Sequence, residues 1–482
     1  MTAVATEIPL GATLTAEQAR EIFQQGEEAV VFALLGLAQL LAKQQAGAAV
    51  VSSPATPSGM RPTYTKPNVE SATPRKRRKK PGRKAGHPGS RRPVPEKIDE
   101  YKDDRLEACP VCGSELVRCA ETRTRYIEDI PPDLKPVVTE HTIHRDWCPE
   151  CHKQVEPKVT DALPGATLGN RVLVLSAWLH YGLGNTLSQI VEVLNFHLQL
   201  KVSPGGLIQM WYRLQEVLYP WYEQIQQEAL RSAVLFADET SWRVKGATRW
   251  LWAFSTTDAV YYMIDRSRGS PALRKFFIQE FAGTLVSDFW GAYNAVVCAQ
   301  RQTCLAHLLR DLLHVEQYKS PSAEWPDFAK KLRRLLGDAI RLWKRDRPEG
   351  TMAGETYASR RTRLDERLQE LIDAPWKDSQ ARRLVKRLRR HQSDLFTFLD
   401  QLNVPFDNNH AERIIRPAVI IRKNSYCNRS ERGADAQAVL MSIYRTLKMR
   451  GHDPLSTIVN AISTYLRTGK LPPLPPKITP AG

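Results

Sequence analysis

Short apolar runs bounded by turn-forming residues predict a group of β-strands in the middle of the chain. The runs at 233–237 and 283–287 have the length of buried strands. Between them, the segments 249–254 and 260–264 flank the turn-like residues 256–258. This spacing predicts three consecutive strands in hairpin order, with a fourth strand later in the chain.

The residues around the fourth strand predict alternating helices and strands. We expect helices over 271–281 and 291–299 and a short strand at 303–305. Consecutive strands followed by alternating helix and strand indicate a ribonuclease H-like α/β fold. In this fold Asp238 would lie on the first strand, and Asp288 would directly follow the fourth.

Three acidic residues far apart in the chain lie where a metal-dependent nuclease core requires carboxylates. Asp238 and Asp288 follow the two apolar runs, and Glu412 lies in the polar segment 408–413. Mg²⁺ prefers oxygen ligands, and two such ions can activate an attacking oxygen and stabilise a leaving one. We therefore predict a catalytic site with two Mg²⁺ (or Mn²⁺) ions. Glu239 adjoins Asp238, but neighbouring strand residues face opposite sides, so we expect only Asp238 in this site.

Polar and basic residues surround Glu412. Asn408 and Arg416 lie one helical turn from Glu412, and Lys423 lies three turns away, so one helix face can carry all four side chains. Together with Arg413, these cations predict contacts with DNA phosphates. The alternative is an exposed basic helix without a ligand.

Three residues are candidates for positioning a phosphate, namely His307, Asn408 and Asn409. His307 opens a predicted helix beside the core. A histidine in such a place more often has a structural role, so both interpretations of His307 stay open.

Two Cys-x-x-Cys pairs predict one structural zinc site. The four thiolates of a tetrahedral Zn²⁺ shell would come from Cys109, Cys112, Cys148 and Cys151. The stretch 136–143 between the pairs has strand-like character, so we expect a zinc-ribbon-like domain with extra strands. Four thiolates complete the shell, and four other residues would then lie outside it: Cys119, His141, His144 and His152.

The chain before the cysteines predicts a helix and a basic arm. Apolar residues at three- and four-residue steps predict an amphipathic helix within 1–45, which either self-associates or packs on its own protein. Residues 46–100 are polar and Pro-rich and predict a flexible linker. An extended basic chain can enter a DNA minor groove, and solvated disorder is the alternative. The basic residues of this arm are Arg75, Lys76, Arg77, Arg78, Lys79, Lys80, Arg83 and Lys84.

The region 161–230 predicts helices across a break at 203–206. Two helices joined by a turn resemble a helix-turn-helix, whose second helix would read a major groove. The apolar residues Trp211, Leu218 and Trp221 favour an internal core at least as well.

Composition points to a large globular protein with a polyanionic partner. A chain of 482 residues suggests about three domains, and its 42% hydrophobic content is enough for packed cores. Lys and Arg number 69 against 52 Asp and Glu, and the resulting net charge of +17 favours nucleic acid. Residues 1–15 do not resemble a secretory signal, and we find no apolar stretch of the roughly 20 residues that would span a membrane. We therefore expect a cytoplasmic protein without a membrane partner.

Several motifs together are typical of one protein family. They are Asp238-Glu239-Thr240, Ser287-Asp288 with Tyr293, Cys304-Leu305-Ala306-His307, and the segment from Asn408 to Pro417, which runs into Arg422-Lys423-Asn424. With these motifs the chain resembles the insertion-sequence-66 (IS66) transposases of bacterial mobile elements over essentially its whole length. One departure is the segment 308–310, where relatives often place arginine sooner.

The resemblance implies a DDE transposase in which Asp238, Asp288 and Glu412 hold two Mg²⁺ ions. Water would attack at the element end, and the freed 3′-hydroxyl would attack target DNA. The implied partners are double-stranded DNA from the element ends and the target, further copies of the chain on that DNA, and accessory proteins encoded by the same element. The implied location is the bacterial cytoplasm, in association with the nucleoid.

The predicted domain organisation follows from these elements. An α-helical insertion precedes the last acidic residue, and its charge suits DNA near the cut site, with a solvated face as the alternative. The expected parts are a helix (1–45), a linker with the basic arm (46–100), a zinc-binding domain (101–160), a helical domain (161–230), a ribonuclease H-like core (231–310 and 404–450), the insertion (311–403) and a tail (451–482).

A second hypothesis assigns no catalysis to the chain. A catalytically inactive or domesticated transposase would act as a DNA-binding regulator. The intact acidic triad favours the enzyme.

Overall fold

The computed structural model describes residues 95–117, 124–127, 130, 134–319, 321–345 and 355–479, with four isolated residues nearer the N-terminus. The basic arm at 75–84, Cys119 and nearly all of the helix expected within 1–45 lie outside the described residues. Their predicted roles stay predictions.

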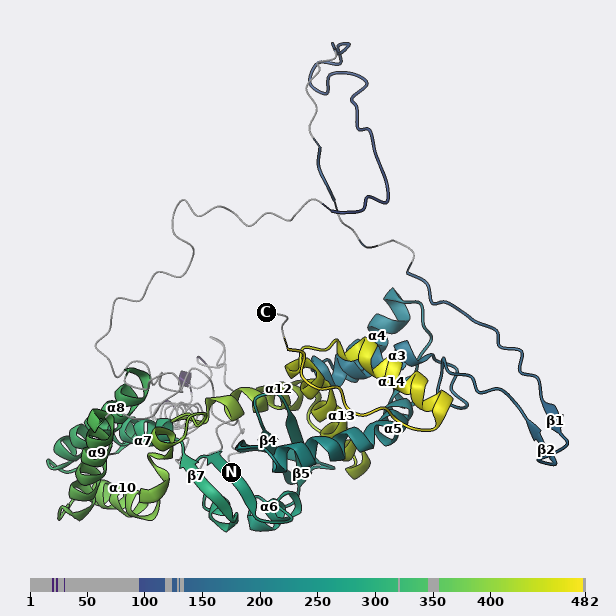
Figure 1. Cartoon of the computed structure of the whole chain (residues 1–482). Coiled ribbons are helices and arrows are strands. Elements are labelled where there is room, and N and C mark those ends of the chain that lie inside the picture. Colours follow the sequence, from purple (N-terminus) through teal and green to yellow (C-terminus); the bar gives the residue numbers. More distant parts are fainter. Residues whose placement is uncertain are drawn as a thin grey trace, which may run out of the picture.

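A mixed five-stranded sheet forms the centre of the molecule (Figure 1), with the strand order β5-β4-β3-β6-β7. β3, β4 and β5 form an antiparallel meander, whereas β6 and β7 run parallel to β3. This arrangement confirms the predicted hairpin order and the strand before Asp288. The strands are β3 (Val234–Val244), β4 (Ala247–Ser255), β5 (Val260–Asp265), β6 (Phe281–Ser287) and β7 (Cys298–Thr303).

The elements after β5 differ from the prediction at their boundaries. The helix expected over 271–281 is shorter, α6 (Ser270–Phe276), because β6 begins at Phe281. The helix expected over 291–299 is a single 3₁₀ turn, Gly291–Ala295. Cys298 already pairs with Phe281, so β7 begins five residues before the expected strand. Pairing with a parallel neighbour thus overrides the local helical pattern.

Helices cover both faces of the sheet. On one face, side chains of β3 and β4 pack against α12 (Asn409–Ser425) and α13 (Glu431–Met449). On the other face, alternate residues such as Ala237 and Phe254 pack against α5 (Pro204–Leu230) and α6. Strand residues alternate between faces, so neighbours on β3 enter different surroundings.

The helical region before the sheet belongs to the main core. It consists of α3 (Asn170–Ala177), α4 (Leu187–Glu192), two π-helical turns (Trp178–Gly182 and Val193–His197) and α5. Trp211, Leu218 and Trp221 of α5 are buried, as the core interpretation predicted. DNA reading by this helix is untested and stays a prediction.

The expected insertion is a helical unit with its own apolar core. Its buried side chains, including Phe328, Leu368 and Leu384, form a cluster that reaches the sheet at Phe236 and Val286. Figure 1 shows this unit at one end of the molecule. Its helices are α7 (Leu305–Tyr318), α8 (Trp325–Arg345), α9 (Glu355–Asp373), α10 (Ser379–Arg390), the 3₁₀ turn Gln392–Asp394 and α11 (Thr397–Asp400).

The described part of the C-terminal segment is structured, including the Pro-rich stretch 471–476 that its composition predicted to be flexible. Pro454–Thr468 forms α14, whose apolar side chains enter the main core. The Pro-rich stretch after it is also held, because the Trp221 indole donates a 2.6 Å hydrogen bond to the Pro472 carbonyl and Leu474 is buried. Within the described residues, the structure has no helix long and apolar enough to cross a membrane.

Candidate active site

Asp238 lies on β3, and Asp288 directly follows the neighbouring parallel strand β6. The last pair of the two strands is Phe236 with Val286, two residues before each carboxylate, and the charge of Asp288 acts on Asp238. Both residues are buried, at 2% and 8% exposure. The structure therefore brings together two of the three acidic residues predicted from the sequence.

Glu412 joins the same centre from α12. It lies in the first turn of that helix, which packs across β3, and is 3% exposed. Its Oε1 accepts a 2.8 Å hydrogen bond from Nη1 of Arg310, a buried residue of α7. Two helices from different parts of the chain thus hold this carboxylate between them.

The three carboxylates form one electrostatic cluster. Burial raises the pKa of Asp238 well above its ordinary value, and the nearby charges of Glu239, Asp288 and Glu412 raise it further. Both effects disfavour the ionised acid. A bound cation would reverse them, so the cluster has the electrostatics of a cation site.

Glu239 has different partners on the opposite face of β3. It accepts hydrogen bonds from Nε and Nη2 of Arg268, at 3.1 and 3.0 Å, and from the Tyr293 hydroxyl at 2.7 Å. Burial and then the charge of Asp288 raise the pKa of Glu239 to about 7, against the opposing effects of Arg268 and Tyr293. The Arg268 guanidinium also lies 3.8 Å from the ring centre of Trp290. Glu239 is thus an internally paired carboxylate.

Two buried oxygens at the centre have no hydrogen-bond partner within the described part of the chain. They are Oδ2 of Asp238 and Oδ1 of Asn408. The other carboxylate oxygen of Asp238 accepts a 2.9 Å bond from the Glu239 amide. An unpaired buried acceptor costs roughly 1–3 kcal/mol, so these oxygens indicate a site that binds a cation or a donor.

The donor set fits Mg²⁺ or Mn²⁺. All the candidate ligands are oxygens, which these ions prefer. Among the described residues, no three His, Cys, Asp or Glu side chains are close enough to enclose a single ion. Mg²⁺ commonly takes only one or two carboxylates and completes its shell with water and substrate phosphate. An open arrangement of Asp238, Asp288 and Glu412 is compatible with such binding.

Two candidates for phosphate positioning have protein partners nearby. Nε2 of His307 lies 3.3 Å from Nη1 of Arg310, which itself binds Glu412. The Asn409 side chain donates a 2.7 Å hydrogen bond to the Asp407 carboxylate. These contacts indicate supporting positions beside the centre, and direct contact with phosphate stays a prediction.

The cations predicted on α12 are exposed. Arg413, Arg416 and Lys423 all present their side chains to solvent. Arg422, which lies beside Lys423, is half-buried and donates hydrogen bonds to the Thr240 hydroxyl and the Ser241 carbonyl, both at 2.7 Å. Arg422 therefore anchors the helix to β3, and the exposed cations are accessible to a ligand.

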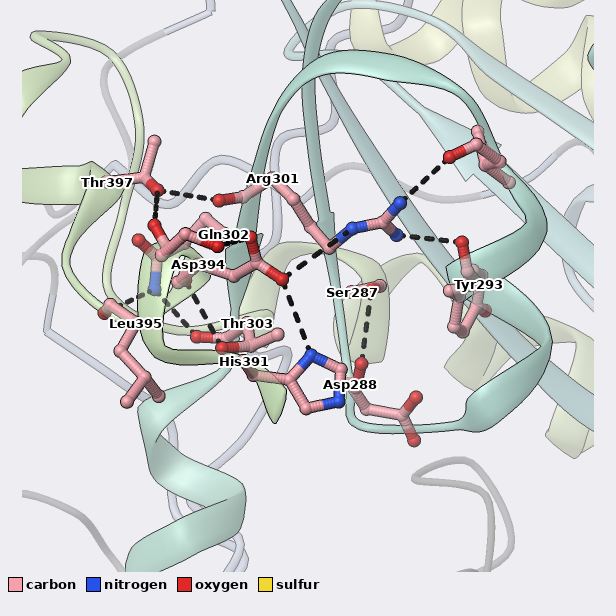
Figure 2. Close-up of polar contacts among 12 residues, drawn as sticks. Ser287, Asp288, Tyr293, Arg301, Gln302, Thr303, His391, Asp394, Leu395 and Thr397 are labelled. Carbon is pink, nitrogen blue, oxygen red and sulfur yellow. Dashed lines mark hydrogen bonds and ion pairs between the residues drawn. The ribbon is translucent and has the colours of Figure 1, made fainter. Parts of the chain in front are cut away.

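Polar contacts tie the sheet edge to the end of the insertion (Figure 2). The Thr397 hydroxyl donates a 2.6 Å hydrogen bond to the Arg301 carbonyl, and the Gln302 side chain donates one of 3.0 Å to the Leu395 carbonyl. Asp288 lies on the adjacent loop in the same view. The insertion is thus fixed to β7, the neighbour of the strand β6 that leads to this carboxylate.

Two buried or partly buried arginines were not predicted from the sequence, Arg310 beside Glu412 and Arg268 beside Glu239. Arg310 lies in the segment 308–310, which departs from the family pattern. Its position one helical turn after His307 was the available signal. For Arg268 we find no signal in the local sequence.

The cysteine region is organised as two local pairs. A hydrogen bond with the Ser114 side chain lowers the pKa of the Cys112 thiol to about 7, and the Cys151 amide lowers that of Cys148. Both effects favour thiolates, the form that binds Zn²⁺. Within the described residues the two pairs are not assembled into one shell. Cys109 completes the first pair, next to Cys112.

The strands of this region also differ from the prediction. The stretch 136–143 has no strand, and the two strands are β1 (Asp146–Cys148) and β2 (Lys153–Val155), which form a hairpin around the second cysteine pair. His141, His144 and His152 are exposed, as expected for residues outside the shell.

Comparison with known proteins identifies the family. Residues 165–436 match the family model described as "Transposase IS66 family", and residues 107–152 match the "zinc-finger binding domain of transposase IS66". The first match covers more than half of the 482 residues. The chain belongs to the IS66 family of transposases, and its cysteine region is a zinc-finger domain of that family.

Similar proteins occur in Sinorhizobium fredii (strain NBRC 101917 / NGR234). Uncharacterized protein y4qI is 25% identical over 413 residues, which cover 76% of this chain and 72% of the relative. Uncharacterized protein y4jD is 23% identical, and the similar region covers 76% of this chain and 76% of the relative. Uncharacterized protein y4hP is 21% identical, and the similar region covers 77% of this chain and 73% of the relative. The similarity therefore spans most of both chains in each comparison.

Proposed function

We propose that the chain is a DDE-type transposase that cuts and joins DNA with Asp238, Asp288 and Glu412. The observation that carries this proposal is the convergence of the three acidic residues in one buried cluster that includes an unpaired Asp238 oxygen. Membership of a transposase family supports DNA as the substrate. The order and directions of the five strands support a ribonuclease H-like core.

The proposed chemistry assigns a role to each group around the scissile phosphate. Asp238 and Asp288 from the sheet, and Glu412 from α12, would hold two Mg²⁺ (or Mn²⁺) ions. When bound, these ions supply Lewis-acid activation of the attacking oxygen and stabilise the leaving oxygen. Arg310 keeps the Glu412 carboxylate in place through their 2.8 Å contact.

The attacking groups differ between the two steps of the proposed reaction. In the first step, water attacks the phosphorus at the element end, and the 3′ oxygen leaves as a hydroxyl. In the second step, that 3′-hydroxyl attacks the phosphorus of a phosphodiester in the target DNA, which joins the two strands and releases the target's own 3′ oxygen as a hydroxyl. We propose that further copies of the chain assemble on the DNA and that accessory proteins of the element take part.

The four cysteines Cys109, Cys112, Cys148 and Cys151 are the proposed ligands of one structural Zn²⁺ ion. Membership of the zinc-finger family and the thiolate-favouring contacts of Cys112 and Cys148 support this assignment. DNA contacts are proposed for the arm at 75–84 and for Arg413, Arg416 and Lys423. The exposure of the three α12 cations supports their part in binding.

Cleavage of DNA that carries the element ends tests the proposal. Asp238→Asn, Asp288→Asn and Glu412→Gln should each abolish Mg²⁺-dependent cleavage, because each variant removes an anionic ligand. DNA affinity should stay close to that of the unmodified chain. Glu239→Gln is the matched control, since its side chain lies on the same strand but already has protein partners, and it should retain cleavage.

Near-normal cleavage by any of the three variants contradicts the proposed triad. DNA binding without cleavage by the unmodified chain, with Mg²⁺ and Mn²⁺ both tried, favours the second hypothesis of a DNA-binding regulator.

A further inference from the structure

The side-chain amide of Asn408 has a fixed orientation. Asn408 is 1% exposed, and its Nδ2 donates a 2.8 Å hydrogen bond to the Ala237 carbonyl. A carbonyl can only accept, so this contact determines which end of the amide is nitrogen. The Asn408 backbone amide is also held, 3.2 Å from the Cys304 sulfur.

This contact lies on the side of β3 that faces β6. The Ala233 carbonyl accepts a 2.9 Å hydrogen bond from the Thr284 amide on that side. Carbonyls of alternate strand residues point the same way, so the Ala237 carbonyl faces β6 as well. Regular pairing between β3 and β6 ends at Phe236, so the Ala237 carbonyl is not used by that pairing. The Asn408 side chain binds this carbonyl instead, next to Asp238.

Oδ1 of Asn408 is a buried acceptor that makes no hydrogen bond within the described part of the chain. Asn408 occupies the N-cap position of α12, where asparagine usually accepts a hydrogen bond from the first turn, but its side chain makes no capping bond. Its Oδ1 has no partner within the described part of the chain. Oδ2 of Asp238, the residue that follows Ala237, is unpaired in the same way.

The unpaired oxygen restricts what Asn408 can bind. Nδ2 already donates one hydrogen bond to Ala237, and Oδ1 itself can only accept. A phosphate oxygen is an anionic acceptor, so it would be repelled by Oδ1. The partner of Oδ1 must therefore be a cation or a hydrogen-bond donor, and the phosphate-positioning role expected for Asn408 from the sequence stays a separate prediction.

We infer that Oδ1 of Asn408 is a direct ligand of a divalent cation held by Asp238. This inference rests on the proposed function and adds a fourth oxygen donor to the three carboxylates. An amide oxygen is a hard ligand that suits Mg²⁺ and Mn²⁺. It also adds no further negative charge to a cluster that already contains several buried carboxylates.

Mn²⁺ binding to the full-length, zinc-loaded chain tests this role without measuring catalysis. Asn408→Ala removes both amide atoms, whereas Asn408→Asp keeps an oxygen donor but loses the Nδ2 contact with Ala237. Titration followed by the electron paramagnetic resonance signal of free Mn²⁺ should show an affinity loss of at least about tenfold for Asn408→Ala. Asn408→Asp should bind Mn²⁺ at least as tightly as the unmodified chain.

Asn170→Ala is the matched control for the loss of a buried asparagine. Asn170 is also buried, donates a 2.8 Å hydrogen bond to the Thr160 carbonyl and has an unpaired Oδ1, but it lies on α3, outside the carboxylate cluster. Its removal should lower the melting temperature and leave Mn²⁺ affinity unchanged.

The outcomes separate this inference from the proposed function. Unchanged Mn²⁺ affinity in Asn408→Ala would overturn the ligand role, and so would an equal loss of affinity in the Ala and Asp variants. In either case Asn408 would only hold the Ala237 carbonyl or accept a hydrogen bond from another group. Asp238→Asn should lose Mn²⁺ binding in every case. If Asp238→Asn also retains it, the proposed metal site itself fails.

Discussion

The two regions of this transposase for which we propose metal sites differ in what holds the candidate ligands in place. Asp238, Asp288 and Glu412 are each less than a tenth exposed and belong to a sheet and a helix that pack in the main core. In the zinc-finger region, by contrast, apolar side chains such as Val111 and Val137 are 92% and 93% exposed. The carboxylates therefore interact inside a packed core, whereas the zinc-finger region has little apolar packing around its described cysteines.

From this difference we expect a bound ion to supply in the zinc-finger region what packing supplies around the carboxylates. Burial of large side chains fixes β3, β6 and α12, so the energy needed to bring the acidic residues together comes from the fold. A segment of about 45 residues whose described apolar side chains are largely exposed lacks this source, and we expect it to depend on zinc for its folding. Metal binding should consequently act on chemistry in one region and on folding in the other.

Zinc removal should have the largest effect and remain confined to one region. Structural Zn²⁺ contributes about 10–16 kcal/mol of apparent binding energy in small fingers, and that energy is folding energy. Treatment with a zinc chelator, or Cys109→Ser or Cys148→Ser, should remove amide exchange protection from residues 107–152 and leave β3 and β6 protected. The intact chain should contain one Zn²⁺.

Cys298→Ser is the control for the zinc experiment, because this half-buried thiol lies outside the matched zinc-finger segment. Loss of protection in the sheet after zinc removal would show that the two regions are not independent. A freshly reduced sample without zinc would contradict the four-thiolate site.

Replacement of Arg310 should destabilise the metal-free carboxylate centre. Arg310 and Glu412 form a buried pair at 2.8 Å, so Arg310→Met leaves a buried charge uncompensated. Breaking such a pair costs about 3–5 kcal/mol in the free energy of unfolding, measurable by urea denaturation. The double variant Arg310→Met with Glu412→Met should recover much of this loss. A single variant as stable as the unmodified chain would show that other groups hold Glu412.

Metal affinity at the carboxylate centre should rise with pH. The pKa of Asp238 is raised by burial and by neighbouring charges, so the acid is protonated over a wider range, and a cation must displace that proton. Affinity should fall as pH is lowered through the raised pKa, by up to tenfold per pH unit for one proton. Calorimetry in buffers with different ionisation enthalpies should detect the released proton.

Glu239→Gln sharpens this test. The charge of Glu239 contributes to the raised pKa of Asp238, so the neutral variant should shift the dependence on pH to lower values. An affinity independent of pH would mean that Asp238 is already ionised in the metal-free protein.

The sequence predicted the local strands around the candidate ligands better than the long-range contacts that hold those residues. The apolar runs directly before Asp238 and Asp288 predict strands from local sequence alone, and both strands form as expected. The contacts of Arg310 with Glu412 and of Asn408 with Ala237 join residues more than 100 positions apart, and no local pattern encodes them. The Pro-rich C-terminal stretch was misjudged for the same reason, because its order comes from packing against α5 and not from its own residues.

The exposed cations of α12 should give the smallest effects, because each contributes one surface contact. Arg416 and Lys423 are exposed on α12, unlike the buried Glu412, so they can bind DNA without supporting the fold. Arg416→Ala and Lys423→Ala should each weaken DNA binding and reduce the slope of log affinity against log salt by about 0.9. Stability and Mn²⁺ affinity should not change.

Arg422→Ala is the contrasting control, since this residue anchors α12 to Thr240 and Ser241, and its loss should lower stability. An unchanged salt slope in both exposed variants would show that this face is only solvated and that DNA contacts lie elsewhere on the chain.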